Sequence, residues 1–169
     1  GTNIDYPVLQ GESNLSYINT DVYGNFALAG SIFLDSRNSS TFADVFSLLY
    51  GHHMENSQMF GDLDKYRSVD FLQQTNTGTL LVPGGRYALR VFACIVVSAS
   101  DDLIYQPLQW QADNVPAMLD RLQADALCVD QAAMDDLRTA QNPKVLCMST
   151  CSSDYTDART VVLAAMQLE

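Results

Sequence analysis

The sequence has little positive charge and no long apolar run. Of its 169 residues, 9 are Lys or Arg and 20 are Asp or Glu, which gives a formal net charge of -11. Such acidity argues against nucleic acid as a partner, and against docking on anionic lipid through the protein's own surface. No apolar stretch approaches the ~18 residues of a membrane span. Membrane contact is therefore expected only through a segment outside this sequence.

The start of the chain supports that expectation. The sequence begins at Gly1 without Met, directly before a strand-like segment at residues 4–8. We interpret this as a trimmed N-terminus and expect the removed segment to hold a membrane anchor. The length suits one domain spanning residues 1–169. A hydrophobic content of 47% with 17% charged residues is typical of a globular protein.

Cysteine and histidine are scarce, with four and two residues. No CxxC pair is present, which argues against a zinc site or a thioredoxin motif. No metal or other cofactor is expected, although the many carboxylates would permit incidental calcium. Cys147 and Cys151 lie ~13 Å apart on one predicted strand, beyond the reach of a disulfide. A Cys94–Cys147 disulfide is conceivable only if their strands are neighbours.

Short β-prone runs dominate the chain. Strands are predicted at residues 4–10, 30–35, 45–50, 80–82, 86–100 and 144–151, with a last one from residue 159. Helical spacing predicts one or two short helices in 59–72 and further helices at 114–127 and 130–137. Antiparallel strands with these spacings predict a mainly β fold, namely a closed barrel of about seven or eight strands with a few inserted helices.

The segment from Lys144 to Val162 carries the strongest chemical signal. Its first apolar run ends at Cys151, and its second begins at Arg159. If the two runs pair as antiparallel strands, a thiol and a guanidinium meet at one end of a sheet, and a cation beside a thiol favours the nucleophilic thiolate. A histidine would complete a catalytic site, and the adjacent His52 and His53 are the two candidates.

Each of these residues also has a plainer interpretation. Cys151 could be a small buried residue of the strand. His52 and His53 could be surface loop residues. Arg159 could be a rim arginine paired with Asp154 or Asp157. On residue types alone, these alternatives stay open.

Several motifs together resemble the sortases, most closely the class B sortases. The resemblance covers nearly the whole chain and is carried by the order and spacing of these segments: IDYPV at residues 4–8, GSIFLDSRN at 30–38, LYGHHM at 49–54, MFGDL at 59–63 and LCMSTC at 146–151, with Arg159 downstream. The helix predicted between Asn114 and Leu127 resembles the one that class B members insert between their late strands. The resemblance implies a sortase-like barrel.

The resemblance also implies roles for individual residues. It identifies Cys151, rather than Cys147, as the nucleophile, His52 as the catalytic histidine and Arg159 as the catalytic arginine. Ser149 and Thr150 match positions that line the family's substrate groove.

The implied activity is that of a cysteine transpeptidase at the extracellular face of a Gram-positive membrane. Such an enzyme cleaves a C-terminal sorting motif of surface proteins or pilins after Thr and forms a thioacyl intermediate. An amine from a peptidoglycan precursor or a pilin lysine then resolves it. Two alternatives are a cysteine protease that hydrolyses the same intermediate and a surface binding module whose Cys–His–Arg set is inactive.

Overall fold

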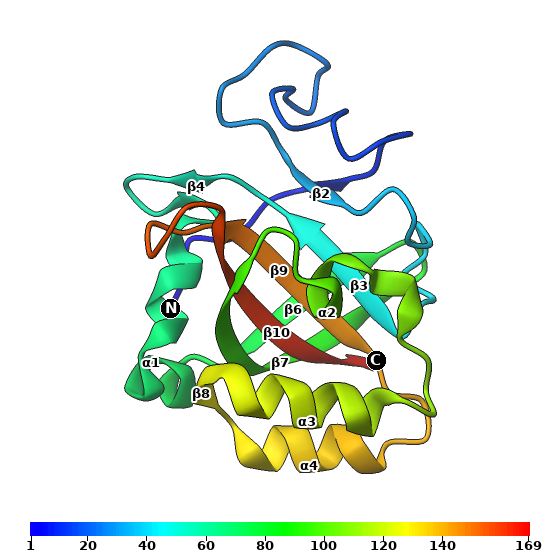
Figure 1. Cartoon of the computed structure of the whole chain (residues 1–169). Helices are drawn as coiled ribbons and strands as arrows, with labels where there is room; N and C mark the ends of the chain where they lie inside the picture. Colours follow the sequence, from blue (N-terminus) through cyan, green and yellow to red (C-terminus); the bar gives the residue numbers. More distant parts are fainter.

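The computed structural model describes residues 1–169, and its centre is one mixed eight-stranded sheet (Figure 1). The strand order is β1-β2-β3-β9-β10-β7-β6, with β8 also pairing with β7. The strands of this sheet are β1 Val8–Leu9, β2 Ile32–Leu34, β3 Phe46–Tyr50, β6 Thr77–Val82, β7 Gly85–Ser98, β8 Ala126–Val129, β9 Val145–Cys151 and β10 Ala158–Leu168. A separate hairpin pairs β4 His53–Met54 with β5 Gln58–Met59.

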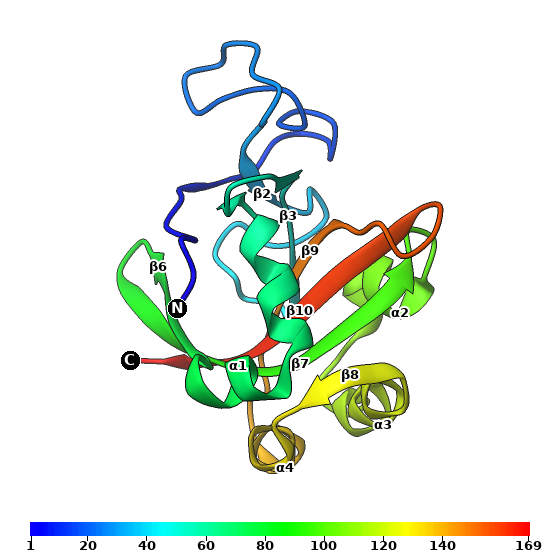
Figure 2. The ribbon, with the colours of Figure 1, turned by 90° about the vertical axis from the view of Figure 1, so that its left-hand side faces the viewer.

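Helices cover both faces of the sheet. In Figure 1, α3 and α4 lie side by side below the sheet, and α1 lies to its left; Figure 2 shows the same layers from the side. The helices are η1 Gly61–Arg67, α1 Val69–Gln74, α2 Asp102–Tyr105, η2 Pro107–Gln109, α3 Val115–Asp125 and α4 Gln131–Thr139. None of them has the length and apolar character that crossing a membrane requires.

The two faces of the sheet have separate apolar cores. One core packs Leu146 and Met148 of β9 with side chains of η1 and α1, and the other packs Val145 and Cys147 with side chains of α2, α3 and α4. Successive residues of a strand point to opposite faces, so a strand between two cores is apolar at every position. The uninterrupted apolar run of β9 has this cause.

The strand directions bring distant segments together at one end of the sheet. β3 and β9 are parallel, so both finish at this end of the sheet, whereas β10 is antiparallel to β9 and begins there. β7 is antiparallel to β10 and also ends there. The residues that follow β3, close β9, open β10 and follow β7 are therefore neighbours in space.

The mainly β fold with inserted helices that was expected from the sequence is confirmed: the main sheet has eight strands, and the β4–β5 hairpin adds two that were not predicted. The 83–84 turn joins β6 to β7 as a hairpin, and α3 and α4 lie close to their predicted ranges. β1 and β6 are the outermost strands in the observed order, and no pairing between them is seen, so closure of the barrel stays a prediction.

Three details differ from expectation. The first strand is short, Val8–Leu9 instead of residues 4–10. Residues 126–127, expected to end a helix, begin β8. Helix α2 at Asp102–Tyr105 was not predicted at all. β1 and β8 are set by pairing with the distant strands β2 and β7, which periodicity alone does not capture, whereas α2 begins at a local cap, Asp101.

Candidate active site

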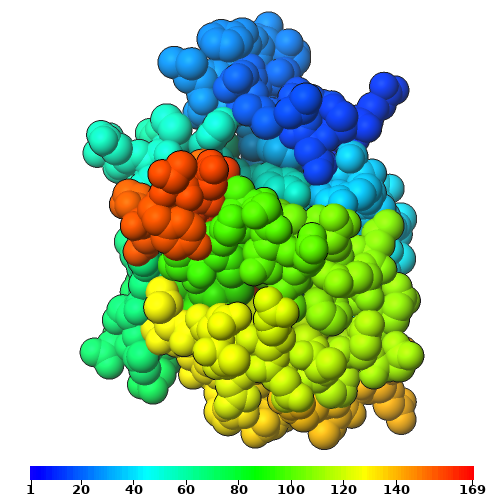
Figure 3. All heavy atoms as spheres, viewed as in Figure 1, coloured from blue at the N-terminus to red at the C-terminus, as the bar shows by residue number.

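A pocket of about 410 Å³ lies at the end of the sheet where these strand ends come together. Its lining includes His52, Cys151 and Arg159, so the three residues that the sequence singled out converge in one cleft. Figure 3 shows the surrounding segments on one face of the molecule: the N-terminal loop in blue, the segment after β7 in green and the β9–β10 loop in orange-red.

Cys151 differs from the other cysteines in its environment. It is exposed at the last position of β9, whereas Cys94, Cys128 and Cys147 are buried. Burial raises the pKa of the Cys147 thiol well above its usual range, and burial raises that of Cys94 to about 12. The buried thiols therefore stay protonated and unreactive. The interpretation of Cys151 as a buried residue is wrong, and Cys147 is no alternative nucleophile.

The disulfide considered from the sequence is absent. All four cysteines are free. Cys94 belongs to the core on the η1 face of the sheet and Cys147 to the core on the α3 face, so the sheet separates their side chains.

Arg159 lies directly opposite Cys151. The two residues are cross-strand partners of β10 and β9, so their side chains share one face of the sheet. The Nη1 atom of Arg159 donates to the carbonyl of Ala158 at 2.9 Å, and the other N–H groups have no partner in the protein. Asp154 pairs with Arg67 instead, at 2.6 Å. Arg159 is therefore not a rim arginine held by Asp154 or Asp157, and its free donors border the pocket.

His52 enters the pocket from the residues that follow β3. Its Nε2 lies 2.7 Å from the carbonyl oxygen of Ile18, and because a carbonyl only accepts, this nitrogen carries the hydrogen. Gly30 holds the N-terminal loop in place for this contact. A Cβ at Gly30 would lie 2.2 Å from the Ile18 oxygen, and its φ of +57° suits glycine.

His53 points elsewhere, as expected for neighbouring residues of an extended segment. Its Nε2 lies 2.8 Å from Oδ2 of Asp64, outside the pocket lining. The assignment of His52 rather than His53 to the cleft therefore agrees with the geometry.

Ser149 and Thr150 have different environments. Ser149 lines the pocket, and its Oγ lies 2.7 Å from the hydroxyl of Tyr105. Burial raises the pKa of Tyr105, so this hydroxyl remains protonated. Thr150 lies outside the lining, and its buried Oγ1 has no hydrogen-bond partner. Alternation along β9 places the Thr150 side chain on the opposite face of the sheet.

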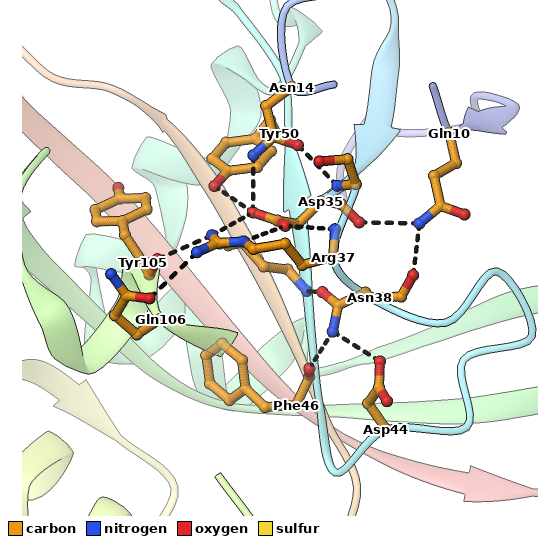
Figure 4. A network of polar contacts seen from close by, with 12 residues as sticks. Gln10, Asn14, Asp35, Arg37, Asn38, Asp44, Phe46, Tyr50, Tyr105 and Gln106 are labelled. Atoms are coloured by element: carbon orange, nitrogen blue, oxygen red, sulfur yellow. Dashed lines mark hydrogen bonds and ion pairs between the residues drawn. The ribbon is translucent and has the colours of Figure 1, made fainter. Parts of the chain in front are cut away.

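The buried carboxylate of Asp35, which directly follows β2, holds together one wall of the pocket. The side chain of Asp35 is 0% exposed. It accepts hydrogen bonds from Nε and Nη2 of Arg37 at 2.8 Å, from the Tyr50 hydroxyl at 2.9 Å and from Nδ2 of Asn14 at 2.9 Å (Figure 4). All three donors line the pocket. One ionised group therefore fixes three side chains of the wall.

The same network links the pocket to α2. Arg37 donates from Nη2 to the Tyr105 carbonyl at 2.9 Å and from Nη1 to Oε1 of Gln106 at 3.2 Å. The rings of Tyr50 and Tyr105 stack with their centroids 6.3 Å apart. A second cavity of about 450 Å³ is lined by Gln106 and also by Arg37, which therefore borders both cavities. Hydrogen bonds and ring stacking thus connect the residues that follow β2 with β3 and α2 along this wall.

Asp35 should make the stability of the protein depend on acidic pH. Burial opposes ionisation, but the donors from Arg37, Tyr50 and Asn14 outweigh it and lower the pKa of Asp35 from 3.8 to about 2. A lowered folded-state pKa contributes stability that is complete above pH 4 and is lost as the pH falls through 2, roughly 2 kcal/mol in all. Urea unfolding at pH 5 and pH 2 measures this loss. Asp35→Asn should show a correspondingly smaller loss, and equal losses would contradict the assignment.

Sequence patterns predicted no role for most residues of this wall. Asn14, Ile18 and Tyr105 lie on different parts of the chain and belong to no motif, whereas Tyr50 lies in the LYGHHM segment at 49–54, which assigned it no role. Asp35 and Arg37 lie in the GSIFLDSRN segment at 30–38, which carried the family resemblance but assigned no role to either side chain.

Comparison with known proteins identifies the family. The family model for the sortase domain matches residues 1–167. Sortase B of Listeria monocytogenes is 32% identical over 165 residues, which are 95% of this chain and 64% of that protein. The chain thus spans somewhat less than two thirds of this relative's length.

Solved structures agree. The structure of Spy0129, a Streptococcus pyogenes class B sortase involved in pilus biogenesis, superimposes with a TM-score of 0.85 at 34% identity, over 99% of this chain and 87% of that one. A Staphylococcus aureus sortase B–substrate complex gives 0.84 at 28% identity, over 99% and 76%. The chain belongs to the sortase family, and its relatives are class B sortases.

Proposed function

We propose that this protein is a cysteine transpeptidase that joins sorting-motif proteins to an amine. The observation that carries the proposal is the convergence of the exposed Cys151 with His52 and Arg159 in one pocket, opposite a wall of fixed polar side chains. Class B sortase relatives, one of them involved in pilus biogenesis and one crystallised with a substrate, support the reaction class.

The first half of the proposed reaction forms a thioacyl enzyme. As the Cys151 sulfur attacks the carbonyl carbon of Thr in the sorting motif, the thiol proton passes to His52, and the developing oxyanion accepts hydrogen bonds from the free N–H groups of Arg159. As the C–N bond breaks, His52 donates a proton to the departing amine. A thioester then links the Thr carbonyl carbon to sulfur.

The second half transfers the acyl group. An incoming amine attacks the thioester, its proton passes to His52, and the C–S bond breaks to release Cys151. The acceptor is an amine of a peptidoglycan precursor or a pilin lysine. The protein would act at the extracellular face of a Gram-positive membrane, held there by an anchor that precedes residues 1–169. We propose that these residues form a single catalytic domain.

The decisive experiment mixes the protein with a sorting-motif peptide and a candidate amine, and identifies the products by mass. Transfer predicts a product that contains the acyl part of the peptide joined to the amine. Triglycine and a lysine-containing pilin peptide distinguish the two acceptor classes. Hydrolysis alone with every amine offered would instead indicate a cysteine protease.

Iodoacetamide labelling separates either enzyme from an inactive binding module. A functional site predicts that Cys151 is alkylated several times faster than a free thiol and that His52→Ala removes the advantage. Labelling no faster than a free thiol would favour the binding module.

A further inference from the structure

Helix η1 lies behind the candidate active site, on the opposite face of the sheet, and has an unusual form. It keeps 3₁₀ geometry over seven residues, although such runs are mostly shorter. With about three residues per turn, residues spaced by three form a straight row along one edge. Gly61, Asp64 and Arg67 form such a row, while Leu63 and Tyr66 are buried in the core.

The first residue of the row lies against the segment that carries His52. A Cβ on Gly61 would lie 2.3 Å from the carbonyl oxygen of Met54, so only glycine permits this approach to the β4–β5 hairpin. The backbone N–H of Phe60, which precedes the helix, donates to the carbonyl of His52 itself at 3.0 Å.

The second residue of the row joins two of the catalytic segments. Oδ1 of Asp64 accepts from the hydroxyl of Thr160 at 2.8 Å, and Oδ2 lies 2.8 Å from Nε2 of His53. Thr160 is fully buried and follows Arg159 in β10, while His53 follows His52. A single carboxylate thus bridges the neighbours of the candidate histidine and arginine.

The third residue of the row holds the loop after Cys151. Nη2 of Arg67 lies 2.6 Å from Oδ1 of Asp154, and this contact is the main reason why the pKa of Asp154 is lowered. The Asp154 carboxylate also bonds the hydroxyl of Ser152, the residue directly after Cys151. The row therefore contacts all three segments that carry the candidate catalytic residues.

We propose that the Gly61-Asp64-Arg67 edge of η1 is a clamp that sets the relative positions of His52, Cys151 and Arg159. Asp64 and Arg67 are positioning residues, since they act through His53, Thr160 and Asp154 and do not touch the pocket. The inference rests on the proposed function for its catalytic consequence, but its geometric part can be tested independently.

The test uses Asp64→Ala, which removes both contacts of the bridge. A displacement of about 1 Å in an active site can cost up to about a hundredfold in rate. We therefore expect kcat for peptide transfer to fall at least about tenfold while KM changes less than about twofold. The rate of Cys151 alkylation should fall as in His52→Ala, and the double variant should be no slower than His52→Ala alone.

Lys65→Gln is the matched control, because Lys65 pairs with Asp62 within the same helix and contacts none of the three segments. It should keep wild-type kcat and alkylation. Thermal unfolding of each variant monitors folding, and Asp64→Leu, which is close in size but has no polar atom for Thr160 or His53, replaces Asp64→Ala if the latter unfolds.

The outcomes separate this inference from the proposed function. Wild-type rates in the Asp64 variant, equal losses in Lys65→Gln, or independent effects of the two substitutions on alkylation would overturn the clamp. If the wild type transfers no peptide but the alkylation coupling holds, the clamp stands and the transpeptidase proposal fails.

Discussion

Cys151→Ala is expected to abolish both cleavage and transfer of a sorting-motif peptide. The thiol is the one exposed cysteine, and it supplies the nucleophile to which the acyl group is attached. Removing the nucleophile of a covalent mechanism lowers kcat by a factor of about 10⁶ in the serine protease subtilisin, so the rate of the variant should fall below detection. Mass spectrometry should also show that the variant accumulates no thioacyl adduct.

Cys147→Ala is the matched control for this experiment. Cys147 lies on the same strand but is buried in the core on the α3 face, away from the pocket. Its loss should cost some stability through a small cavity and leave most of the turnover. A Cys147 variant that is inactive while folded, or a Cys151 variant that still transfers peptide, would refute the assignment of the nucleophile.

Asp35→Ala is expected to cause the largest loss of stability. Its carboxylate is fully buried and accepts from Arg37, Tyr50 and Asn14, so its removal leaves a partly buried cation and two donors without their acceptor. Breaking a buried ion pair by removing one partner costs about 3–5 kcal/mol. Urea unfolding measures this change, and KM for the peptide should rise because the pocket wall loses its support.

The Arg86–Glu169 pair is the natural comparison, because it is also an arginine with a carboxylate but both side chains are exposed, at 61% and 47%. Exposed pairs contribute about 0–1 kcal/mol, so Glu169→Ala should change stability little. Similar losses in the two variants would mean that the Asp35 network does not support the pocket.

Sequence reasoning identified the fold class because the relevant patterns are local. The apolar run of β9 ends at a cysteine, and the turn at residues 83–84 lies between β-prone runs, so strands and hairpin follow from a few residues each. The same reasoning missed β8, which forms by pairing with β7, and α2, a four-residue helix capped by Asp101 whose Leu103 and Ile104 are buried in the core on the α3 face.

The site was predictable only in part for a related reason. Cys151 and Arg159 are close in sequence and pair across two strands, so their proximity could be inferred. Thr150 was grouped with Ser149 by motif, yet alternation along β9 sends the two side chains to opposite faces. The pocket wall gathers residues from β2, β3 and α2, and no spacing in the sequence encodes such a meeting.

The place of β9 and β10 at the centre of the sheet has a consequence for how the protein is made. These strands are translated after β3 and β7, which gain their inner neighbours only once β9 and β10 have been made. A chain without β9 and β10 therefore leaves one edge of β3 and one edge of β7 unpaired, and such edges invite association with other chains. β9 and β10 must therefore be made before the sheet can cover its two cores, and until then the nascent chain carries two strand edges that favour association.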